Sequence, residues 1–247
     1  MPPGKWLRTY IITPPFSAFC FAMFWLTGVL IHPFDRTRRM AHHVARFWSH
    51  LLLRTAGIRI HTEGLDHISP PACYVLVSNH LSLADTPLMC AYLPGLFRFM
   101  AKESLMKVPL IGGHLRRGGH ISVARDDARS AVRSLAVAAK LIEAGEGSVL
   151  IFAEGGRSEG EIRAFKGGAA HLAIKSHVPV VPMAIAGTGE VMPKGAKLLR
   201  PGAIALIAGE PVDTRGMTPA DRDSLTTVLQ DRVAALSQRA ATVIGRG

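Results

Sequence analysis

The sequence predicts an α/β fold: a mostly parallel central sheet flanked by helices, with a membrane-associated helical segment at the amino terminus. From residue 72 onward, short apolar runs of strand length alternate with helical stretches, which is the pattern of an open parallel sheet. The 22 residues from Tyr10 to Ile31 carry no charge and are rich in Phe, so they are long enough to cross a hydrocarbon core. A chain of 247 residues can also bury one substantial core.

The uncharged segment has basic residues on both sides, and more of them follow it than precede it: Lys5 and Arg8 before it, then Arg36, Arg38 and Arg39. This bias predicts that the following domain lies on the cytoplasmic side of the inner or plasma membrane. Pro14-Pro15 leaves a shallow or re-entrant insertion open as an alternative to spanning. A cleaved signal peptide is a second alternative, although the apolar stretch is long for one.

The next segment, His43 to Ile58, places Arg46, His50 and Arg54 at a spacing of four, with large apolar residues between them. This pattern indicates an amphipathic helix, either a basic one at the membrane interface or an ordinary helix packed on the domain. We therefore divide the chain into a membrane-associated helical region, residues 1–58, and an α/β domain, residues 59–247.

Six strands are predicted in the α/β domain: Ala72–Ser78, Leu96–Ala101, His120–Ala124, Ser148–Ala153, Val178–Ile185 and Ala203–Ala208. Ala128–Ala144 is the clearest helix, because its apolar residues recur on one face. A second helix is predicted to start at Thr218-Pro219, a good cap and first-turn pair, and to run to about Val243.

Composition narrows the function classes. The formal net charge is +11, yet 48% of the residues are hydrophobic and the mean hydropathy is +0.23. This combination favours a membrane surface or anionic small molecules over nucleic acid, since there is no zinc-finger spacing and there are only 3 Tyr and 3 Trp for stacking on bases. The three cysteines form no disulfide framework and no CxxC pair, so no metal site is expected.

One apolar run ends in a histidine with a carboxylate five residues later, His80 and Asp85. If a strand-to-helix turn lies between them, Asp85 can accept from one ring nitrogen while the other takes a proton from an attacking hydroxyl. The same spacing recurs at His61 and Asp66. That stretch is polar and contains Gly, so we interpret it as a surface loop.

Charged residues follow several other predicted strands. Lys102, Arg125 and Glu154 each lie at or just past a strand end, and strand ends of a parallel sheet meet at one edge. Lys102 and Arg125 could neutralise a phosphate there, with Arg157 as a bidentate donor. After Glu154, Gly155 and Gly156 would let the backbone approach a ligand. Solvated surface charges and a plain turn are the alternatives.

These motifs resemble the glycerolipid acyltransferases of the 1-acylglycerol-3-phosphate O-acyltransferase type. Four segments match the family's motifs in order: Ser78-Asn79-His80 through Asp85, Gly119 to Arg125, Phe152 to Ser158, and Val178 to Pro182. The resemblance covers about residues 60 to 210. Two positions depart from the third motif, because Ala153 replaces the usual Pro and Gly156 the usual Thr.

The resemblance implies an enzyme without a cofactor that moves a fatty acyl group from acyl-CoA or acyl-carrier protein to lysophosphatidic acid. It implies His80 as the base and Asp85 as its partner, with the phosphate held by Lys102, Arg125 and Arg157. Glu154 with Gly155 would position the glycerol. Ser82 is not expected to act as a nucleophile, because no G-x-S-x-G elbow surrounds it.

Two other functions stay open. The acceptor could be another lysolipid, such as a lyso-ornithine lipid, for which the arginines would be less necessary. In a different class, the chain could be a non-catalytic protein that binds membrane lipids, although a protein of that class has no need of a base and its partner.

Overall fold

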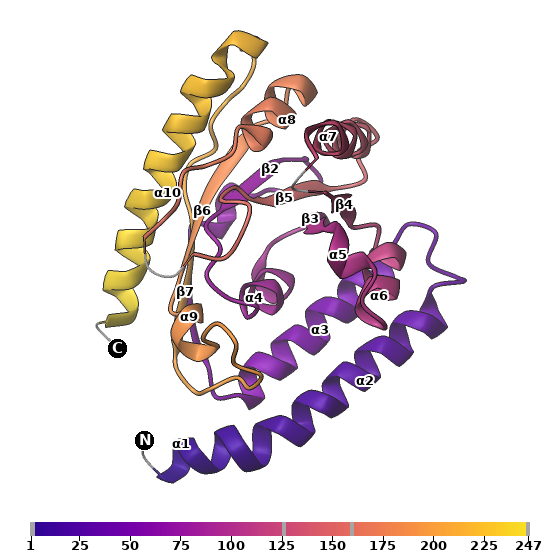
Figure 1. Ribbon diagram of the computed structural model, residues 1–247, viewed down its shortest axis with the longest axis vertical. Helices are drawn as coiled ribbons and strands as arrows, with labels where there is room; N and C mark the ends of the chain where they lie inside the picture. Colours follow the sequence, from indigo (N-terminus) through magenta and orange to yellow (C-terminus); the bar gives the residue numbers. More distant parts are fainter. Residues whose placement is uncertain (1–2, 125–126, 159–160, 246–247) are drawn as a thin grey trace.

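A single mixed sheet forms the centre of the computed structural model, which describes residues 3–124, 127–158 and 161–245 (Figure 1). Its strand order is β1-β7-β6-β2-β5-β3-β4, and every neighbouring pair is parallel except β6 and β7. The strands are β1 (Arg59–Glu63), β2 (Val75–Ser78), β3 (Phe97–Lys102), β4 (Ile121–Val123), β5 (Ser148–Phe152), β6 (Val180–Ala186) and β7 (Ala203–Ala208). The predicted fold class is confirmed.

Helices cover both faces of the sheet. On one face, α7 (Ala128–Glu143), α8 (Gly168–Ser176) and α10 (Arg222–Gly245) share a core with Val75 and Val77. On the other, α3 (Arg39–Thr55) and α4 (Asp85–Tyr92) share a core with Leu76. Successive residues of a strand point to opposite faces, so an apolar strand such as β2 contributes to both cores.

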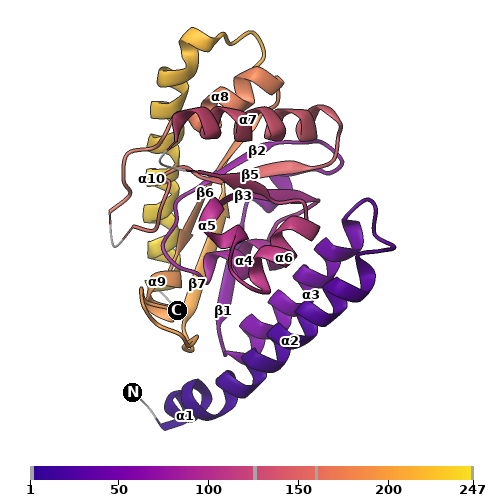
Figure 2. The ribbon, with the colours of Figure 1, turned by 45° about the vertical axis from the view of Figure 1, so that its right-hand side comes forward.

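The amino-terminal region is a helical hairpin. A short helix α1 (Pro3–Leu7) and a π-helical turn (Arg8–Ile12) lead into α2 (Thr13–Ile31), which runs beside α3 along one side of the molecule (Figures 1 and 2). Pro14 and Pro15 lie in the first turn of α2, where proline is tolerated.

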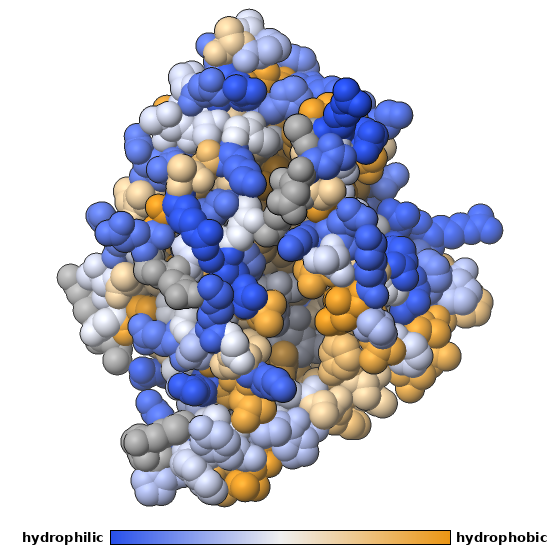
Figure 3. All heavy atoms as spheres, in the orientation of Figure 1, coloured by the Kyte–Doolittle hydropathy of each residue, from blue (hydrophilic) through white to orange (hydrophobic). Residues whose placement is uncertain are grey.

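The hairpin exposes apolar side chains. Phe34, at the turn between α2 and α3, is 82% exposed, and Phe19, Leu26 and Leu30 of α2 are exposed as well. Figure 3 shows apolar residues gathered on the side where α2 and α3 lie. Within the described residues, one helical stretch, Pro3–Ile31, is long and apolar enough to cross a membrane.

α3 is also part of the α/β body. Its Leu53, together with Ala56 and Ile58 just after it, is buried in the core that contains Leu76 and Leu88. The hairpin therefore joins the domain through α3, whereas α2 lies outside it and contacts mainly α3.

The six predicted strands are present, and the helices predicted at 128–144 and 218–243 correspond to α7 and to a 3-10 turn (Pro219–Asp221) continued by α10. The remaining elements are α5 (Glu103–Met106), α6 (Ile111–Arg117), α9 (Thr188–Val191) and a 3-10 turn (Leu65–His67).

One sequence interpretation was wrong. His61 lies in the edge strand β1, not in a loop, and Asp66 lies in the 3-10 turn that follows. An edge strand needs only backbone pairing, here with β7, so its polar sequence gave no alternation by which to recognise it.

Candidate active site

The site begins where β2 ends. Asn79, fully buried, directly follows the strand, and its side-chain amide nitrogen donates to the Ile185 carbonyl at 2.9 Å while its amide oxygen accepts from the Ile185 N–H at 2.8 Å. This two-point bond fastens the chain to β6 at the position where it leaves the sheet. The position of the next residue, His80, is thereby fixed relative to the sheet.

His80 and Asp85 meet across the turn between β2 and α4. The His80 Nδ1 atom lies 2.6 Å from Asp85 Oδ2, and the same oxygen accepts from the N–H groups of Leu81 at 2.8 Å and Ser82 at 2.9 Å. Asp85 is the first residue of α4, where the helix dipole favours a negative charge. Its side chain is 0% exposed, whereas that of His80 is 13% exposed.

This geometry fixes the tautomer of His80. An acceptor-only carboxylate next to Nδ1 places the ring proton there, so Nε2 carries the lone pair and is free to take a proton. The ring lies flat against Phe152 of β5, with the two centroids 4.1 Å apart and the planes 12° from parallel. The carboxylate of Asp85 and the phenyl ring of Phe152 together restrict the imidazole ring to one orientation.

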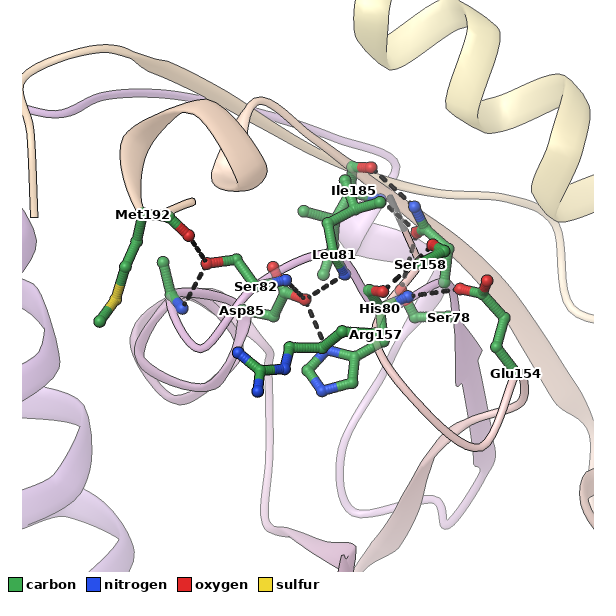
Figure 4. Close-up of polar contacts among 12 residues, drawn as sticks. Ser78, His80, Leu81, Ser82, Asp85, Glu154, Arg157, Ser158, Ile185 and Met192 are labelled. Carbon is green, nitrogen blue, oxygen red and sulfur yellow. Dashed lines mark hydrogen bonds and ion pairs between the residues drawn. The ribbon is translucent and has the colours of Figure 1, made fainter. Parts of the chain in front are cut away.

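The segment after β5 holds the backbone of His80. The His80 N–H donates to Glu154 Oε1 at 2.8 Å, and the His80 carbonyl accepts from the Ser158 N–H at 2.8 Å and from its hydroxyl at 3.3 Å (Figure 4). The other oxygen of Glu154 accepts from the Arg163 N–H at 2.9 Å. Glu154 and Ser158 are both buried, so the third motif acts as a clamp on the first.

Of the predicted basic and glycine residues, Gly155 and Arg157 follow β5, and Lys102 ends β3. In the view of Figure 4, the Arg157 side chain extends across the turn that carries His80 and Asp85. Gly155 has φ +71°, a backbone conformation that favours glycine; a Cβ there would lie 2.9 Å from Cε of Lys166, a flexible side-chain end that can shift. Lys102 ends β3, at the same edge of the sheet as the end of β5, and is exposed. Arg125 lies outside the described residues.

Ser82 has a structural role. Its hydroxyl donates to the Met192 carbonyl at 2.7 Å and accepts from the Ala84 N–H at 3.2 Å, and the residue is 1% exposed. A buried hydroxyl bonded on both sides and not in contact with the His80 ring is not arranged as a nucleophile.

Sequence reasoning did not assign roles to Asn79, Phe152 and Ser158. A polar residue directly after a buried strand was the available signal for Asn79. Phe152 and Ser158 both contact His80, which lies more than seventy positions earlier in the sequence. Only the pairing of β2 with β5 brings these residues together.

Comparisons with known proteins agree with this geometry. Residues 59–186 match the family model described as Acyltransferase. The chloroplastic 1-acyl-sn-glycerol-3-phosphate acyltransferase BAT2 of Brassica napus is 34% identical over 79% of this chain and 58% of its own length. The 1-acyl-sn-glycerol-3-phosphate acyltransferase of Limnanthes alba is 30% identical over 86% of this chain and 78% of its own.

A solved structure is similar over nearly its whole length. The crystal structure of the 1-acyl-sn-glycerophosphate (LPA) acyltransferase PlsC from Thermotoga maritima superposes with a TM-score of 0.74 at 26% identity, covering 94% of this chain and 97% of that one. Against the plant relatives the span is shorter: the chain covers 58% of the Brassica napus protein and 53% of LPAT1 of Arabidopsis thaliana.

Proposed function

The chain belongs to the acyltransferase family, and from that premise we propose that it transfers a fatty acyl group to the free hydroxyl of 1-acylglycerol 3-phosphate, forming phosphatidic acid. The donor is a thioester, acyl-CoA or acyl-carrier protein. The names of the similar proteins described above support this acceptor, since each is a 1-acyl-sn-glycerol-3-phosphate acyltransferase or its equivalent. The observation that carries the proposal is the 2.6 Å contact between His80 Nδ1 and Asp85 Oδ2.

The proposed reaction is a direct displacement. Nε2 of His80 takes the proton of the acceptor hydroxyl as that oxygen attacks the thioester carbonyl carbon. The C–O bond forms, the C–S bond breaks, and the imidazolium returns its proton to the departing thiolate. Asp85 stabilises the imidazolium charge between these two steps and keeps the ring in place. No covalent acyl-enzyme is needed.

The acceptor would be held by the groups around the histidine. Lys102, Arg125 and Arg157 are proposed to bind its phosphate, since a phosphate offers several acceptor oxygens and close to two negative charges. Glu154 with Gly155 is proposed to position the glycerol. A carboxylate accepts about four hydrogen bonds, so the two backbone bonds of Glu154 leave it capacity for a glycerol hydroxyl.

We further propose that the protein works at a membrane, where its acceptor lies. The exposed apolar side chains of α2 and the length of the Pro3–Ile31 stretch support this. The excess of basic residues after that stretch supports placing the α/β domain on the cytoplasmic side of the inner or plasma membrane.

The test is thiol release by the purified full chain, measured with a panel of lysolipids. His80→Ala is expected to lower the rate about 10²–10⁴-fold, the usual scale for a lost general base. His61→Ala is the matched control, because it removes the histidine of the other His-x4-Asp pair, and it should leave the rate unchanged. Similar losses in both variants, or no turnover of any lysolipid by the unaltered chain, would contradict the proposal.

A further inference from the structure

A second polar site lies away from His80, at the joint between the hairpin and the α/β body. A recess of about 20 Å³ opens there between α3, β3 and the connection from α6 to β4. Its polar lining is entirely basic or imidazole: Arg38, His42, Arg98, His114 and His120.

Arg98 is the unusual member of this group. It is 1% exposed, and its Nη1 donates to the Phe97 carbonyl at 3.2 Å, while Nε and Nη2 have no hydrogen-bond partner among the described residues. Nε–H and the adjacent Nη2–H lie on one edge of the guanidinium and form the fork that binds two oxygens of a carboxylate or phosphate. A buried charged donor without a partner is costly, so a fork left open in the interior indicates a ligand.

No carboxylate of the described residues pairs with this fork. Asp35 and Glu146 act on Arg98 only from a distance, because neither forms an ion pair with it. Asp35 Oδ2 instead accepts from the Ala41 N–H at 2.7 Å, and Glu146 is exposed.

The histidines of the recess are neutral. Burial, reinforced by neighbouring positive groups, lowers the pKa of His42 and His114 to about 4 and that of His120 to about 3. The Nδ1 atom of His120 accepts from the Phe99 N–H at 3.1 Å, so its proton is on Nε2, which is available as a second donor.

The recess adjoins a larger, open groove. The groove has a volume of about 560 Å³ and shares Arg38 and His120 with the recess. It runs between the edge strand β4 and α7, and its charged side chains are mostly basic: Arg38, Arg116, Arg133 and Lys140, with Glu146 as the single acid. A ligand with several negative oxygens would meet positive charge along the whole groove.

We propose that Arg98 and this groove bind a phosphate group. The recess holds little more than one water-sized group, so the Arg98 fork would take the inner edge of the phosphate and the groove its outer oxygens. The group would be a free phosphate or the headgroup phosphate of a lipid beside the hairpin. Arg98 is separate from the acceptor site, since it is the second residue of β3 and Lys102 is the last, about 13 Å apart along the strand.

The experiment compares the full chain in a neutral detergent with Arg98→Met and, as a matched control, Arg232→Met, which removes an exposed arginine of α10. All are measured in an Arg157→Met background, so that phosphate binding near His80 is weakened equally in every sample. The probes are inorganic phosphate against chloride at equal ionic strength, and phosphatidylglycerol against phosphatidylcholine in the micelle. The readouts are Tm and Kd.

We expect a saturating probe to raise Tm by roughly 5 °C or more, and Arg98→Met to weaken binding at least about 10-fold while Arg232→Met changes it less than about 2-fold. Without a probe, Arg98→Met should be no less stable than its parent, because a buried unpaired charge is replaced by an apolar chain of similar length. A response to inorganic phosphate identifies the phosphate group itself as the ligand, and a response to phosphatidylglycerol alone identifies a lipid headgroup. No response to either probe, or an equal response with and without Arg98, would overturn the proposal.

Discussion

At the scale of single residues, His80 is held by four hydrogen bonds, one at its ring and three at its backbone. The three backbone bonds come from Glu154 and Ser158. A general base must reach the acceptor hydroxyl within hydrogen-bond distance, and a displacement of about 1 Å can cost about 100-fold in rate. The third motif therefore contributes to the chemistry through the position of His80, apart from any contact with substrate.

Glu154→Gln tests this role. The amide keeps one acceptor oxygen, but its NH₂ group faces either the His80 N–H or the Arg163 N–H, two donors that it cannot accept from. We expect kcat to fall about 10- to 100-fold with the protein still folded. Glu143→Gln, at the exposed end of α7, is the control and should have no effect. A change confined to the acceptor KM would instead mean that Glu154 acts only on the substrate.

The sequence predicted the pairing of His80 with Asp85, because a strand, a turn and Pro87 put the two side chains on either side of one bend. It could not predict the flat contact with Phe152 or the bonds from Ser158. These depend on the register of β2 with β5, which places Ser78 opposite Phe152, and a single sequence does not contain strand register.

At the scale of elements, the two helices of the hairpin differ in how they contact the α/β body. α3 contributes Leu53 to the main core, whereas α2 leaves Phe19, Leu26 and Leu30 exposed. Removal of residues 1–58 would open the core, but removal of residues 1–31 takes away α2 and keeps α3. The shorter deletion is the sharper test of a membrane role.

We expect the full chain to sediment with membranes even at high salt, because apolar burial outlasts screened charge attraction. Deletion of residues 1–31 should lower this association, and should reduce activity on bilayer-embedded lysolipid more than activity on a soluble short-chain acceptor. Flotation and thiol release measure the two effects. Equal activity of the truncated chain on both acceptors would show that α2 only completes the fold.

The joint between hairpin and body also makes stability depend on pH. Burial near positive groups lowers the pKa of His42 and His114 to about 4 and that of His120 to about 3, from the ordinary histidine value of about 6.5. The pKa of His42 is lowered by the charges of Arg46, Arg98 and His43. That of His114 is lowered by Arg117. That of His120 is lowered by His114, Arg98, His42 and Arg38. The unfolded chain therefore binds protons that the native protein does not, and this stability is present above about pH 6.5 and is lost as the pH falls toward 4.

The variant His42→Gln removes one of these three titrating groups. Each such histidine steepens the fall in unfolding free energy by about 1.4 kcal/mol per pH unit between its unfolded and native pKa values. We expect denaturant titrations from pH 7 to pH 4.5 to show a shallower slope in His42→Gln by about that amount. Equal slopes in the variant and the unaltered chain would mean that His42 takes up its proton in the native state as well.

Most elements were predictable because apolar runs and helical periodicity mark buried strands and amphipathic helices. β1 was missed since three of its residues are exposed and its sequence is polar. The antiparallel pairing of β6 with β7 could not be predicted from the sequence either, because the path of the connection through α9 is set by packing and not by any residue pattern.

At the scale of the whole molecule, the charge distribution bears on the acceptor. The chain has a net charge of +11, and β2, β3 and β5 end in parallel at the edge where His80, Lys102 and Arg157 lie. Like charges at one edge repel each other, so their assembly is favoured when an anion lies among them. An acceptor with a phosphomonoester supplies that anion, and a lyso-ornithine lipid does not.

The decisive measurement is a competition between 1-acylglycerol 3-phosphate and a lyso-ornithine lipid at equal concentrations. We expect the phosphate-bearing acceptor to be acylated much faster, also faster than a phosphate-free 1-acylglycerol, with inorganic phosphate inhibiting weakly. Arg157→Met should remove most of this preference by raising the KM for the acceptor, and should leave the KM for the donor unchanged, because a lost charge-assisted bond to the phosphate costs about 10-fold or more. A selective loss of acyl-CoA binding in Arg157→Met would assign the arginine to the donor. Faster acylation of the lyso-ornithine lipid would exclude phosphatidic acid as the main product, while the roles of His80 and Asp85 would stand, since either hydroxyl needs the same base.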